Sequence, residues 1–509
     1  MSALINVSQY LETACARHPD RIAVRDGARA ISFAELRTRV IAEALAIRRL
    51  LHGETRKVVA VHLGKSLEAV IADLAIIYSG NAYMNLDVKS PSRRTGAVLA
   101  QTAPALLIAG DDAPECAAPR HRMGEAAAPS GEEELRALFQ ALDTLVDTDL
   151  LCLINTSGST GVPKAVALNH RSFIDFTEAV ADAGLVGDSE IVGSLSPVIF
   201  DIFSFELCML MAKGSTLVLI PDTLAAFPAR MLELMQAERV SFIFWVPTIM
   251  VNIANMRLLD SLPLPDLRMV WFAGEVFPTA RFNYWREALP DAVFANFYGP
   301  IEITLDCLYQ LLPEPLPPDE PLPIGRPFRN TAVLVLDEHD ENVPPEAPGR
   351  EGELCVRGSS LAMGYYNDPE KTRAAFTQNP LNRAYPETIY RTGDIVCWNA
   401  RGELLFRGRK DSLIKHSGYR IELGEIEHAA LHCGTALTNA CALYDAAAKK
   451  IILVCEAPEP PDDKALRREL GKALPRYMLP GLFVHVTEMP RNANGKIDRN
   501  SLAQRYGCK

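Results

Sequence analysis

The sequence lacks several features that would direct a protein to nucleic acid or to a membrane. The net charge is −11 and no block of basic residues is present, which argues against a nucleic-acid partner. No apolar run approaches the ~18 residues that a membrane-spanning helix requires. Residues 1–6 carry neither a basic segment nor an apolar core, so no secretory signal is evident. We therefore expect a cytoplasmic protein with no membrane partner.

Patterns typical of zinc sites and disulfide frameworks are missing as well. The eleven cysteines are scattered singly, and none forms Cys-x-x-Cys or stands at zinc-binding spacing from a histidine. We interpret them as reduced and mostly buried thiols. The chain has 509 residues and 48% hydrophobic composition, which is sufficient for two to four units with their own cores.

A stretch of small residues and hydroxyls at 154–164 (INTSGSTGVPK) is the most informative part of the chain. Apolar runs at 150–154 and 165–168 flank it and predict two short strands. Backbone N–H groups freed by glycine can surround phosphate oxygens, and Lys164 adds a positive point charge. An ordinary flexible turn is the alternative. The strand–loop–strand setting with a lysine at its end favours phosphate binding.

This stretch is not a Walker loop, because Pro163 precedes the lysine and a strand follows instead of a helix. It resembles the signature of the adenylate-forming superfamily, which includes acyl-CoA synthetases, luciferases and the adenylation domains of nonribosomal peptide synthetases. The resemblance implies that the loop holds the phosphates of ATP. The residues concerned are Thr156, Ser157, Gly158, Ser159, Thr160, Gly161 and Lys164.

The order of buried strands and helices predicts a layered α/β fold. A capping box, Ser32 with Glu35, predicts a helix start. Residues 111–134 are polar and predict a surface loop, and the proline-dense stretch 312–323 predicts an extended connector. Three further strands predict a small barrel-like β part, and the tail predicts a small α+β domain of about 90 residues. These strands lie at 332–336, 352–357 and 389–398.

The sequence Tyr-Gly-Pro-x-Glu at 298–302 is specific to this superfamily when it follows the loop at 154–164. The resemblance implies that Tyr298 lies against adenine, that Asn296 bonds the adenine edge and that Glu302 binds Mg²⁺. The chemistry agrees, because a purine stacks on an aromatic face and a hard cation prefers carboxylate oxygen. Gly274 and Glu275 follow a predicted strand, where ligands of α/β sheets lie.

Two residues depart from the superfamily pattern. Ile301 stands where threonine is usual, so a phosphate contact there would have to come from Thr304 or from a main-chain N–H. Ser417 stands where the peptide-synthetase branch usually has arginine, so a contact used in the second half-reaction would differ. The sequence IELGEIE at 421–427 is nevertheless closer to that branch than to acyl-CoA synthetases.

Four charged residues complete the implied site. Asp394, in the sequence YRTGD at 390–394, would accept the ribose hydroxyls with help from Arg409, although an ordinary turn is the alternative. Asp411 matches the superfamily's hinge residue and divides the chain into a core at 1–410 and a mobile lid at 411–509. Lys496, in an Asn-Gly-Lys sequence, would enter the site, steady the transferring carboxylate and α-phosphate, and withdraw after the first step. A solvated turn is the alternative for this sequence.

Asp201 lies in a strongly apolar stretch, where a carboxylate needs a partner. It is either the N-cap of a helix at 203–211 or, as in amino-acid-activating members, the group that holds the substrate's α-ammonium. The superfamily's specificity pocket maps, by motif spacing, onto Asp201, Ile202, Phe205, Phe244, Trp271, Ala273, Phe297, Leu305, Asp306 and Lys496.

The aromatic residues of this set leave little volume, so we predict a small amino acid: glycine, alanine or serine. Asp306 would accept a hydroxyl or a second amine, which favours serine or a short diamino acid. A neighbouring backbone N–H is the alternative partner for Asp306.

The predicted function is ATP-dependent, Mg²⁺-dependent formation of an aminoacyl-adenylate, followed by transfer to a phosphopantetheine thiol. Positioning and charge neutralisation would supply most of the catalysis. The sequence shows no carrier or condensation motif, so we expect a free-standing enzyme with a separate carrier protein as its partner. An acyl- or aryl-CoA synthetase is the first alternative. A non-catalytic nucleotide sensor is the second, although Lys164, Glu302, Asp394 and Lys496 are all present.

Overall fold

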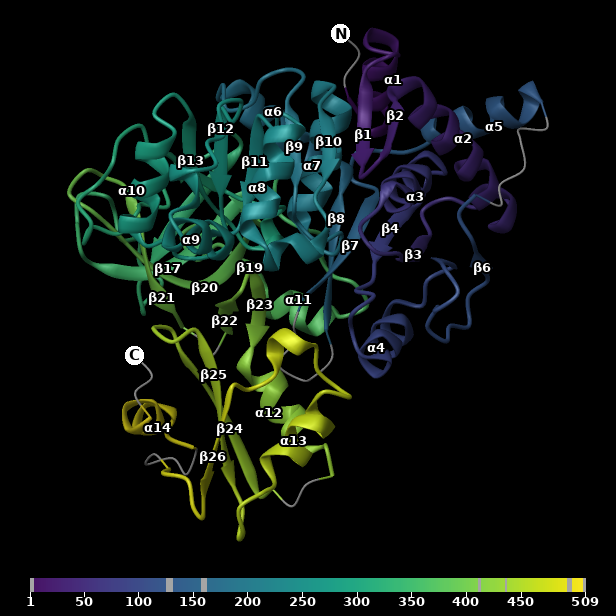
Figure 1. Ribbon diagram of the computed structural model, residues 1–509. Helices are drawn as coiled ribbons and strands as arrows, with labels where there is room; N and C mark the ends of the chain where they lie inside the picture. Colours follow the sequence, from purple (N-terminus) through teal and green to yellow (C-terminus); the bar gives the residue numbers. More distant parts are fainter. Residues whose placement is uncertain are drawn as a thin grey trace.

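The computed structural model describes residues 4–124, 131–156, 163–410, 413–434, 437–491 and 497–506, apart from the side chain of residue 500. Figure 1 shows a large lobe built from the N-terminal part of the chain and a smaller lobe formed by its C-terminal part. Among the described residues, no helix is both long and apolar enough to cross a membrane.

The first elements follow the predicted order. They are α1 (Ser8–Arg17), the antiparallel hairpin of β1 (Ile22–Asp26) and β2 (Arg29–Ser32), and α2 (Phe33–Leu50). Ser32 Oγ accepts a hydrogen bond from Glu35 N, and the Glu35 carboxylate accepts one from Ser32 N, both at 3.2 Å. The capping box predicted from the sequence is therefore confirmed.

A seven-stranded sheet carries the phosphate-loop strands. Its order is β18 (Gly364–Tyr365), β8 (Lys164–Asn169), β7 (Leu150–Thr156), β4 (Ala82–Asn85), β3 (Val58–His62), β5 (Leu106–Ala109) and β6 (Arg120–His121). β7 and β8 are antiparallel with Thr156 opposite Lys164, whereas β3, β4 and β5 are parallel. The two strands predicted around the loop are confirmed, and their register brings both ends of the loop together.

A nine-stranded sheet forms the second layer. Its order is β15 (Arg326–Pro327), β14 (Leu308–Leu311), β13 (Val293–Tyr298), β12 (Met269–Phe272), β11 (Phe242–Trp245), β9 (Ile191–Ser194), β10 (Thr216–Leu219), β1 and β2. The strands from β13 to β1 run parallel, so their carboxyl ends lie along one edge. In such sheets ligands bind beyond that edge.

Helices cover and separate the two sheets. Almost every side chain of α3 and α7 is buried, as expected for helices that are apolar all round, and one apolar core joins them to strands of both sheets. The helices of this lobe are α3 (Leu67–Tyr78), α4 (Ser92–Thr102), α5 (Glu132–Asp143), α6 (His170–Asp182), α7 (Asp201–Lys213), α8 (Pro228–Ala237), α9 (Pro247–Asn255), α10 (Thr279–Ala288) and α11 (Pro369–Ala375), with 3₁₀ turns η1 (Asp222–Ala226), η2 (Leu258–Asp260) and η3 (Ile301–Ile303).

The strand-rich part predicted as barrel-like is a five-stranded antiparallel sheet centred on the long strand β20. Residues 312–323, predicted as a connector, contain neither helix nor strand. The strands of this sheet are β16 (Thr331–Leu336), β17 (Glu351–Gly358), β20 (Thr388–Trp398), β19 (Phe376–Gln378) and β21 (Leu404–Arg409). β20 pairs with β17, β19 and β21 and thereby carries Asp394 toward the neighbouring nine-stranded sheet.

The C-terminal lobe has its own apolar cores and the predicted helix–strand–strand–helix–strand order. A hairpin precedes this order and reaches the large lobe (Figure 1). The elements are β22 (Leu413–His416), β23 (Tyr419–Glu422), α12 (Leu423–Leu431), β24 (Asn439–Asp445), β25 (Lys450–Glu456), α13 (Asp463–Leu470), η4 (Arg476–Met478), β26 (Leu482–Val486) and α14 (Arg499–Arg505).

Two local predictions were wrong. Residues 111–134 are not loop throughout, because they contain the short strand β6 and the start of α5. Helix α7 begins at Asp201 itself and its N-cap residue is Phe200, so Asp201 does not cap the helix. Its Oδ1 accepts a hydrogen bond from the adjacent Ile202 N at 2.9 Å, and Asp201 lines the cavity described below.

Candidate active site

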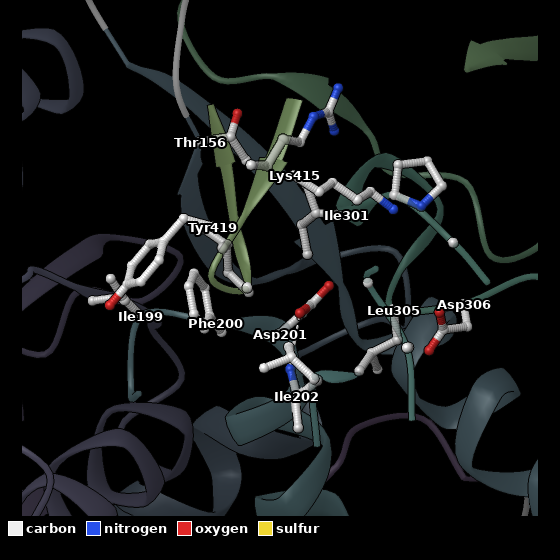
Figure 2. A pocket seen from close by; sticks show the side chains of 18 of the residues that line it. Thr156, Ile199, Phe200, Asp201, Ile202, Ile301, Leu305, Asp306, Lys415 and Tyr419 are labelled. Carbon is white, nitrogen blue, oxygen red and sulfur yellow. Dashed lines mark hydrogen bonds between the residues drawn. The ribbon is translucent and has the colours of Figure 1, made fainter. Parts of the chain in front are cut away.

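A cavity of about 150 Å³ lies where the C-terminal hairpin meets the carboxyl ends of the parallel strands (Figure 2). The position matches the edge at which α/β sheets bind ligands. It is lined by Arg94, Ile154, Asn155, Thr156, Ile199, Phe200, Asp201, Ile202, Val246, Ala273, Gly274, Gly299, Pro300, Ile301, Leu305, Asp306, Asp394, Arg409, Lys415, Gly418, Tyr419, Arg420 and Tyr477. Motifs that are more than 200 residues apart in sequence therefore share one cavity.

Asp201 stands at the first turn of α7 and lines this cavity (Figure 2). Burial raises the pKa of its carboxyl to about 6, although hydrogen bonds from the backbone and the positive charge of Lys415 act in the opposite direction. A carboxylate held in this way gains most from a cationic partner.

Asp306 is the second carboxylate of the cavity and is only 4% exposed. Burial, and then the charge of Asp201, raise the pKa of Asp306 well above its ordinary value, while Lys415 lowers it in part. In the described part of the chain, no hydrogen bond or ion pair reaches this carboxylate, so the predicted alternative of a backbone N–H partner is not found. A buried carboxylate without a donor is costly.

The backbone around Asp306 is shaped to present it to the cavity. Thr304 and Leu305 both have positive φ values, 56° and 66°, which non-glycine residues rarely adopt. A Cβ at Gly299 would lie 2.3 Å from Asp306 Cα, so only glycine permits this close approach. Thr304 Oγ1 is buried, has no hydrogen-bond partner within the described part of the chain, and does not line the cavity.

Four predicted pocket residues pack against one another instead of lining the cavity. Trp271 stacks on Phe297 at 4.4 Å and on Phe205 at 5.7 Å between ring centroids. Phe244 contacts Trp271 at 5.5 Å and lines a neighbouring cavity. These rings occupy the ends of α7, β11, β12 and β13 and fill the space below Asp201, while Ile202, Ala273 and Leu305 remain at the cavity wall.

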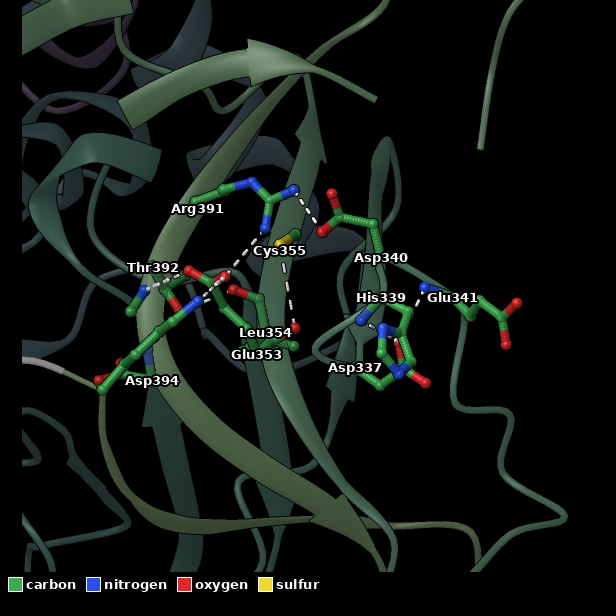
Figure 3. Close-up of polar contacts among 12 residues, drawn as sticks. Asp337, His339, Asp340, Glu341, Glu353, Leu354, Cys355, Arg391, Thr392 and Asp394 are labelled. Atoms are coloured by element: carbon green, nitrogen blue, oxygen red, sulfur yellow. Dashed lines mark hydrogen bonds and ion pairs between the residues drawn. The ribbon is translucent and has the colours of Figure 1, made fainter. Parts of the chain in front are cut away.

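Asp394 on β20 is held by several hydrogen bonds. Its carboxylate accepts from the Tyr298 hydroxyl and from Arg409. Figure 3 shows how its strand is fixed: Asp394 N donates to Thr392 Oγ1 at 3.0 Å, and Gly393 N donates to Glu353 Oε1 at 3.2 Å. The carboxylate therefore enters the cavity in a fixed orientation.

The residues predicted to contact adenine lie beside the cavity. Lys415 Nζ lies 5.7 Å from the centroid of the Tyr298 ring, and burial lowers the pKa of Lys415. Asn296 Nδ2 donates to Pro323 O at 2.8 Å, and Asn296 is not among the residues that line the cavity. Gly274 does line it, whereas Glu275 accepts hydrogen bonds from Thr248 N and, at 2.8 Å, from Gly418 N of the hairpin.

Glu302 is completely buried and is bonded to two residues. Its Oε1 accepts from the Tyr365 hydroxyl at 2.9 Å and its Oε2 from Arg420 at 2.6 Å. Burial alone would raise the pKa of Glu302, but the charge and hydrogen bond of Arg420 lower it below the ordinary value. In the described ranges no group of three or more potential metal ligands occurs. Mg²⁺ commonly uses one or two carboxylates together with substrate phosphates, so Glu302 would serve as its ligand only where the ion replaces the guanidinium of Arg420.

Lys164 points at the C-terminal lobe: its Nζ donates to Glu422 Oε1 at 2.6 Å. The hairpin brings three further residues to the site: Lys415, Arg420 and Glu422. These residues were not assigned to the site by the sequence analysis. All three stand within the motif at 412–427, but their roles depend on the placement of one lobe against the other. Ser417 forms the hairpin turn with φ 53°.

Several predicted site residues lie outside the described residues: Ser157, Gly158, Ser159, Thr160, Gly161, Asp411 and Lys496. Their roles stay predictions. Thr156 and Ile301 do line the cavity.

Comparison with known proteins agrees with this geometry. A family model described as AMP-binding enzyme matches residues 11–366. The chain belongs to this family. It is 32% identical over 504 residues to the L-proline--[L-prolyl-carrier protein] ligase of Streptomyces coelicolor, covering 94% of this chain and 92% of that protein. It is 34% identical to Novobiocin biosynthesis protein H of Streptomyces niveus, covering 88% and 74%. It also matches Surfactin synthase subunit 1 of Bacillus subtilis at 30% identity, but over only 14% of that protein.

Solved structures share the fold. IdnL1 superposes with a TM-score of 0.82 at 25% identity, covering 96% of this chain and 100% of that one. The adenylation domain AlmE of Vibrio cholerae, in complex with glycyl-adenosine-5'-phosphate, superposes with a TM-score of 0.83 at 20% identity, covering 100% and 99%. The superfamily and the α/β fold predicted from the motifs are thereby confirmed, and the protein is an AMP-forming adenylation enzyme of the nonribosomal peptide synthetase type.

Proposed function

We propose that this enzyme activates a small amino acid with ATP and transfers the aminoacyl group to the phosphopantetheine thiol of a separate carrier protein. The observation that carries the proposal is Asp201, a cavity-lining carboxylate without a basic partner among the described residues. An α-ammonium placed there would complete a charge-assisted hydrogen bond. The similarity to a prolyl-carrier protein ligase along nearly the whole chain supports the same class of substrate.

In the first half-reaction the amino acid's carboxylate attacks the α-phosphorus of ATP, and pyrophosphate leaves. Asp201 would hold the ammonium, and Asp394 with Arg409 the ribose. Lys164 and the loop 156–161 would hold the leaving phosphates. Mg²⁺ on Glu302 would offset the phosphate charge, and Lys496 would act at the transferring carboxylate. Asp394 is held in place by Tyr298 and Arg409, and preorganised polar groups of this kind supply a large share of an enzyme's rate.

The size of the cavity limits the substrate. The cavity measures about 150 Å³ and the rings of Phe205, Trp271 and Phe297 fill the space beneath it. Glycine, alanine and serine are the substrates that this space favours. The unpartnered Asp306 would be satisfied by a side-chain hydroxyl or amine, which favours serine or a short diamino acid. Discrimination by a single methylene reaches only about 10–200-fold, so related small amino acids would also be activated.

A second cavity of about 200 Å³ suits the thiol-transfer step. It shares Phe200, Ile202, Val246, Gly418 and Tyr419 with the first cavity and continues past Lys89 and Asp222. We assign it to the pantetheine arm.

The described residues on either side of Lys496 belong to the C-terminal lobe. Arg491 and Ile497 form an antiparallel β-bridge, and Ile497 packs on a core of this lobe. In the proposed function, the C-terminal lobe carries Lys496 and rotates about residue 411 between the two half-reactions.

The test is ATP–pyrophosphate exchange with a panel of amino acids, followed by loading of a phosphopantetheinylated carrier. Exchange that depends on a small amino acid, with highest activity for serine or a short diamino acid, is expected. Preference for a large aromatic or aliphatic amino acid would contradict the size argument. Exchange driven by carboxylic acids without an amine, with thioester formed on coenzyme A, would identify a CoA synthetase instead. Nucleotide binding without any exchange would identify a sensor.

A further inference from the structure

Helix α3 carries a fully buried carboxyl, that of Asp73. The rest of the helix is apolar apart from Glu68, which stands in its first turn and pairs with Arg29 at 2.7 Å. In the described part of the chain no basic side chain pairs with Asp73, and its one hydrogen bond comes from a neutral amide, that of Asn85. Burial raises the pKa of Asp73 to about 8, while this hydrogen bond acts in the opposite direction. At neutral pH the carboxyl is therefore mostly uncharged, which avoids the cost of a buried charge.

The amide of Asn85 connects this carboxyl to the turn that precedes Asp201. Asn85 is the last residue of β4 and is only 6% exposed. Its Nδ2 donates to Asp73 Oδ2 at 2.8 Å and to Val198 O at 3.1 Å. Residues 197–200 form a turn, closed by a hydrogen bond of 3.1 Å between the main chains of its first and last residues. Both hydrogens of the Asn85 amide are thus used, and the amide has a defined orientation.

The turn at 197–200 leads directly into the wall of the active-site cavity. Ile199, Phe200 and Asp201 follow Val198 in the chain, and all three line the cavity (Figure 2). Val198 is buried, so its carbonyl needs a partner from the protein. Phe200, the N-cap of α7, makes no side-chain hydrogen bond to the start of that helix. The contact from Asn85 is therefore a polar restraint on the segment that delivers Asp201.

We propose that Asp73 and Asn85 are positioning residues for the amino acid: they hold the turn at 197–200 and thereby set the orientation of the Asp201 carboxylate. The inference rests on the proposed function, because it takes Asp201 as the group that binds the ammonium. Neither Asp73 nor Asn85 lines the cavity that contains Asp201, so both would act through the main chain. Asn85 supplies the donor to Val198 O, and Asp73 supplies the acceptor that stops the amide from rotating.

Asn81 provides a matched control, because it is a second buried asparagine at the opposite end of the same strand. It directly precedes β4 and is 2% exposed. Its Oδ1 accepts from Lys57 N and its Nδ2 donates to Ser79 Oγ, both at 2.9 Å. Neither contact leads to the turn before Asp201. Asn81→Ala should therefore lower the melting temperature and leave the KM for the amino acid unchanged.

The experiment measures ATP–pyrophosphate exchange by the full chain with serine, or with the panel amino acid that the wild-type enzyme activates fastest. Asn85→Ala and Asp73→Leu should raise the KM for this amino acid about tenfold and the KM for ATP less than about twofold. A tenfold change corresponds to about 1.4 kcal/mol, within the cost of leaving a buried acceptor without its donor. Asp73→Asn keeps the size and an oxygen acceptor for the Asn85 amide, so its KM should stay within about threefold of the wild-type value.

A double variant separates positioning from general stability. In the Asp201→Ala background, Asn85→Ala should add less than about twofold to the KM for the amino acid, because two residues that act on one contact are not additive. Full additivity would overturn the inference. An equal increase of this KM in Asn81→Ala would do the same, as would an unchanged KM in Asn85→Ala and Asp73→Leu. Asn85→Ser repeats the test with a smaller disturbance of the fold. A wild-type enzyme without exchange for any amino acid would instead refute the proposed function.

Discussion

Asp201 and Asp306 line one small cavity, and among the described residues neither carboxylate forms an ion pair with a basic side chain. Two such groups are costly in a protein interior unless a ligand supplies donors. An amino acid brings at least one donor, its ammonium, and a polar side chain brings a second. Under the proposed function, the pair would favour a short substrate with donors at two ends.

Replacement of Asp201 tests the first of these contacts. Asp201→Ala should lower kcat/KM for the amino acid in exchange by about 10²- to 10³-fold, because loss of one partner of a buried ion pair costs about 3–5 kcal/mol. The KM for ATP should change little, since Asp201 does not contact Asp394 or Arg409. Full activity with the same amino acid would contradict the role of Asp201.

Replacement of Asp306 tests the second contact. Asp306→Ala should lower kcat/KM for serine or a short diamino acid by about tenfold or more, since an unmade hydrogen bond to a buried group costs about 1–3 kcal/mol. Alanine offers no side-chain donor and should lose less than about threefold. Asp306→Asn is the matched variant, because it keeps the size and retains an acceptor for a hydroxyl. An equal loss for alanine and serine would show that Asp306 supports the backbone and does not read the side chain.

The pH dependence of binding follows from the raised pKa of Asp201, about 6, which burial causes. Below this pH the carboxyl is protonated in the free enzyme and cannot pair with an ammonium. Affinity for a non-hydrolysable aminoacyl-sulfamoyl adenosine should therefore fall about tenfold per pH unit below about 6 and stay level from there to about pH 7.7, where an α-amino group begins to lose its proton. Calorimetry measures this directly. The analogue without the amino group is the control and should show no such decrease; identical profiles for the two compounds would contradict the assignment.

The sequence and the structure agree best where the signal is local. The strands around 154–164 and the capping box at Ser32 depend on neighbouring residues only, and both were predicted correctly. The helix boundary at Asp201 was predicted two residues late because Phe200, which has no capping side chain, occupies the N-cap. The burial of Trp271 beneath the cavity depends on which face of β12 packs against α7, and motif spacing does not contain that information.

The contacts of the C-terminal hairpin were not predicted at all. Lys164 and Glu422 are separated by 258 residues, and their contact depends on how one lobe rests on the other. The motifs assigned Lys164 to the phosphate loop, but they assigned no site role to Glu422 and said nothing of this pairing. The contact of Asn296 could not be predicted for the same reason. Its side-chain amide donates a hydrogen bond to Pro323 O, and the position of Pro323 depends on the path of an irregular connector.

The ribose contact predicts a separable effect on the nucleotide. Asp394→Asn should raise the KM for ATP by about tenfold or more, because a neutral amide accepts weaker hydrogen bonds than a carboxylate. It also loses the ion pair with Arg409. The KM for the amino acid should change little. Tyr298→Phe is the graded control, since it removes one hydrogen bond to Asp394 and keeps the ring; a larger effect from this variant than from Asp394→Asn would contradict the ribose role.

Gly299→Ala should disturb the site through the backbone alone. The added Cβ would lie 2.3 Å from Asp306 Cα and 2.4 Å from Leu305 O, and both are main-chain atoms that cannot move aside as a side chain could. Overpacking of this kind costs about 1–3 kcal/mol, so thermal unfolding should begin at a lower temperature, and exchange activity should fall because Asp306 shifts. Gly402→Ala is the control: its added Cβ meets nothing within 4 Å, although its φ of 70° makes the change mildly strained. A Gly299→Ala enzyme with unchanged melting temperature and substrate preference would show that the loop at 304–306 adapts freely and does not fix Asp306 in the cavity.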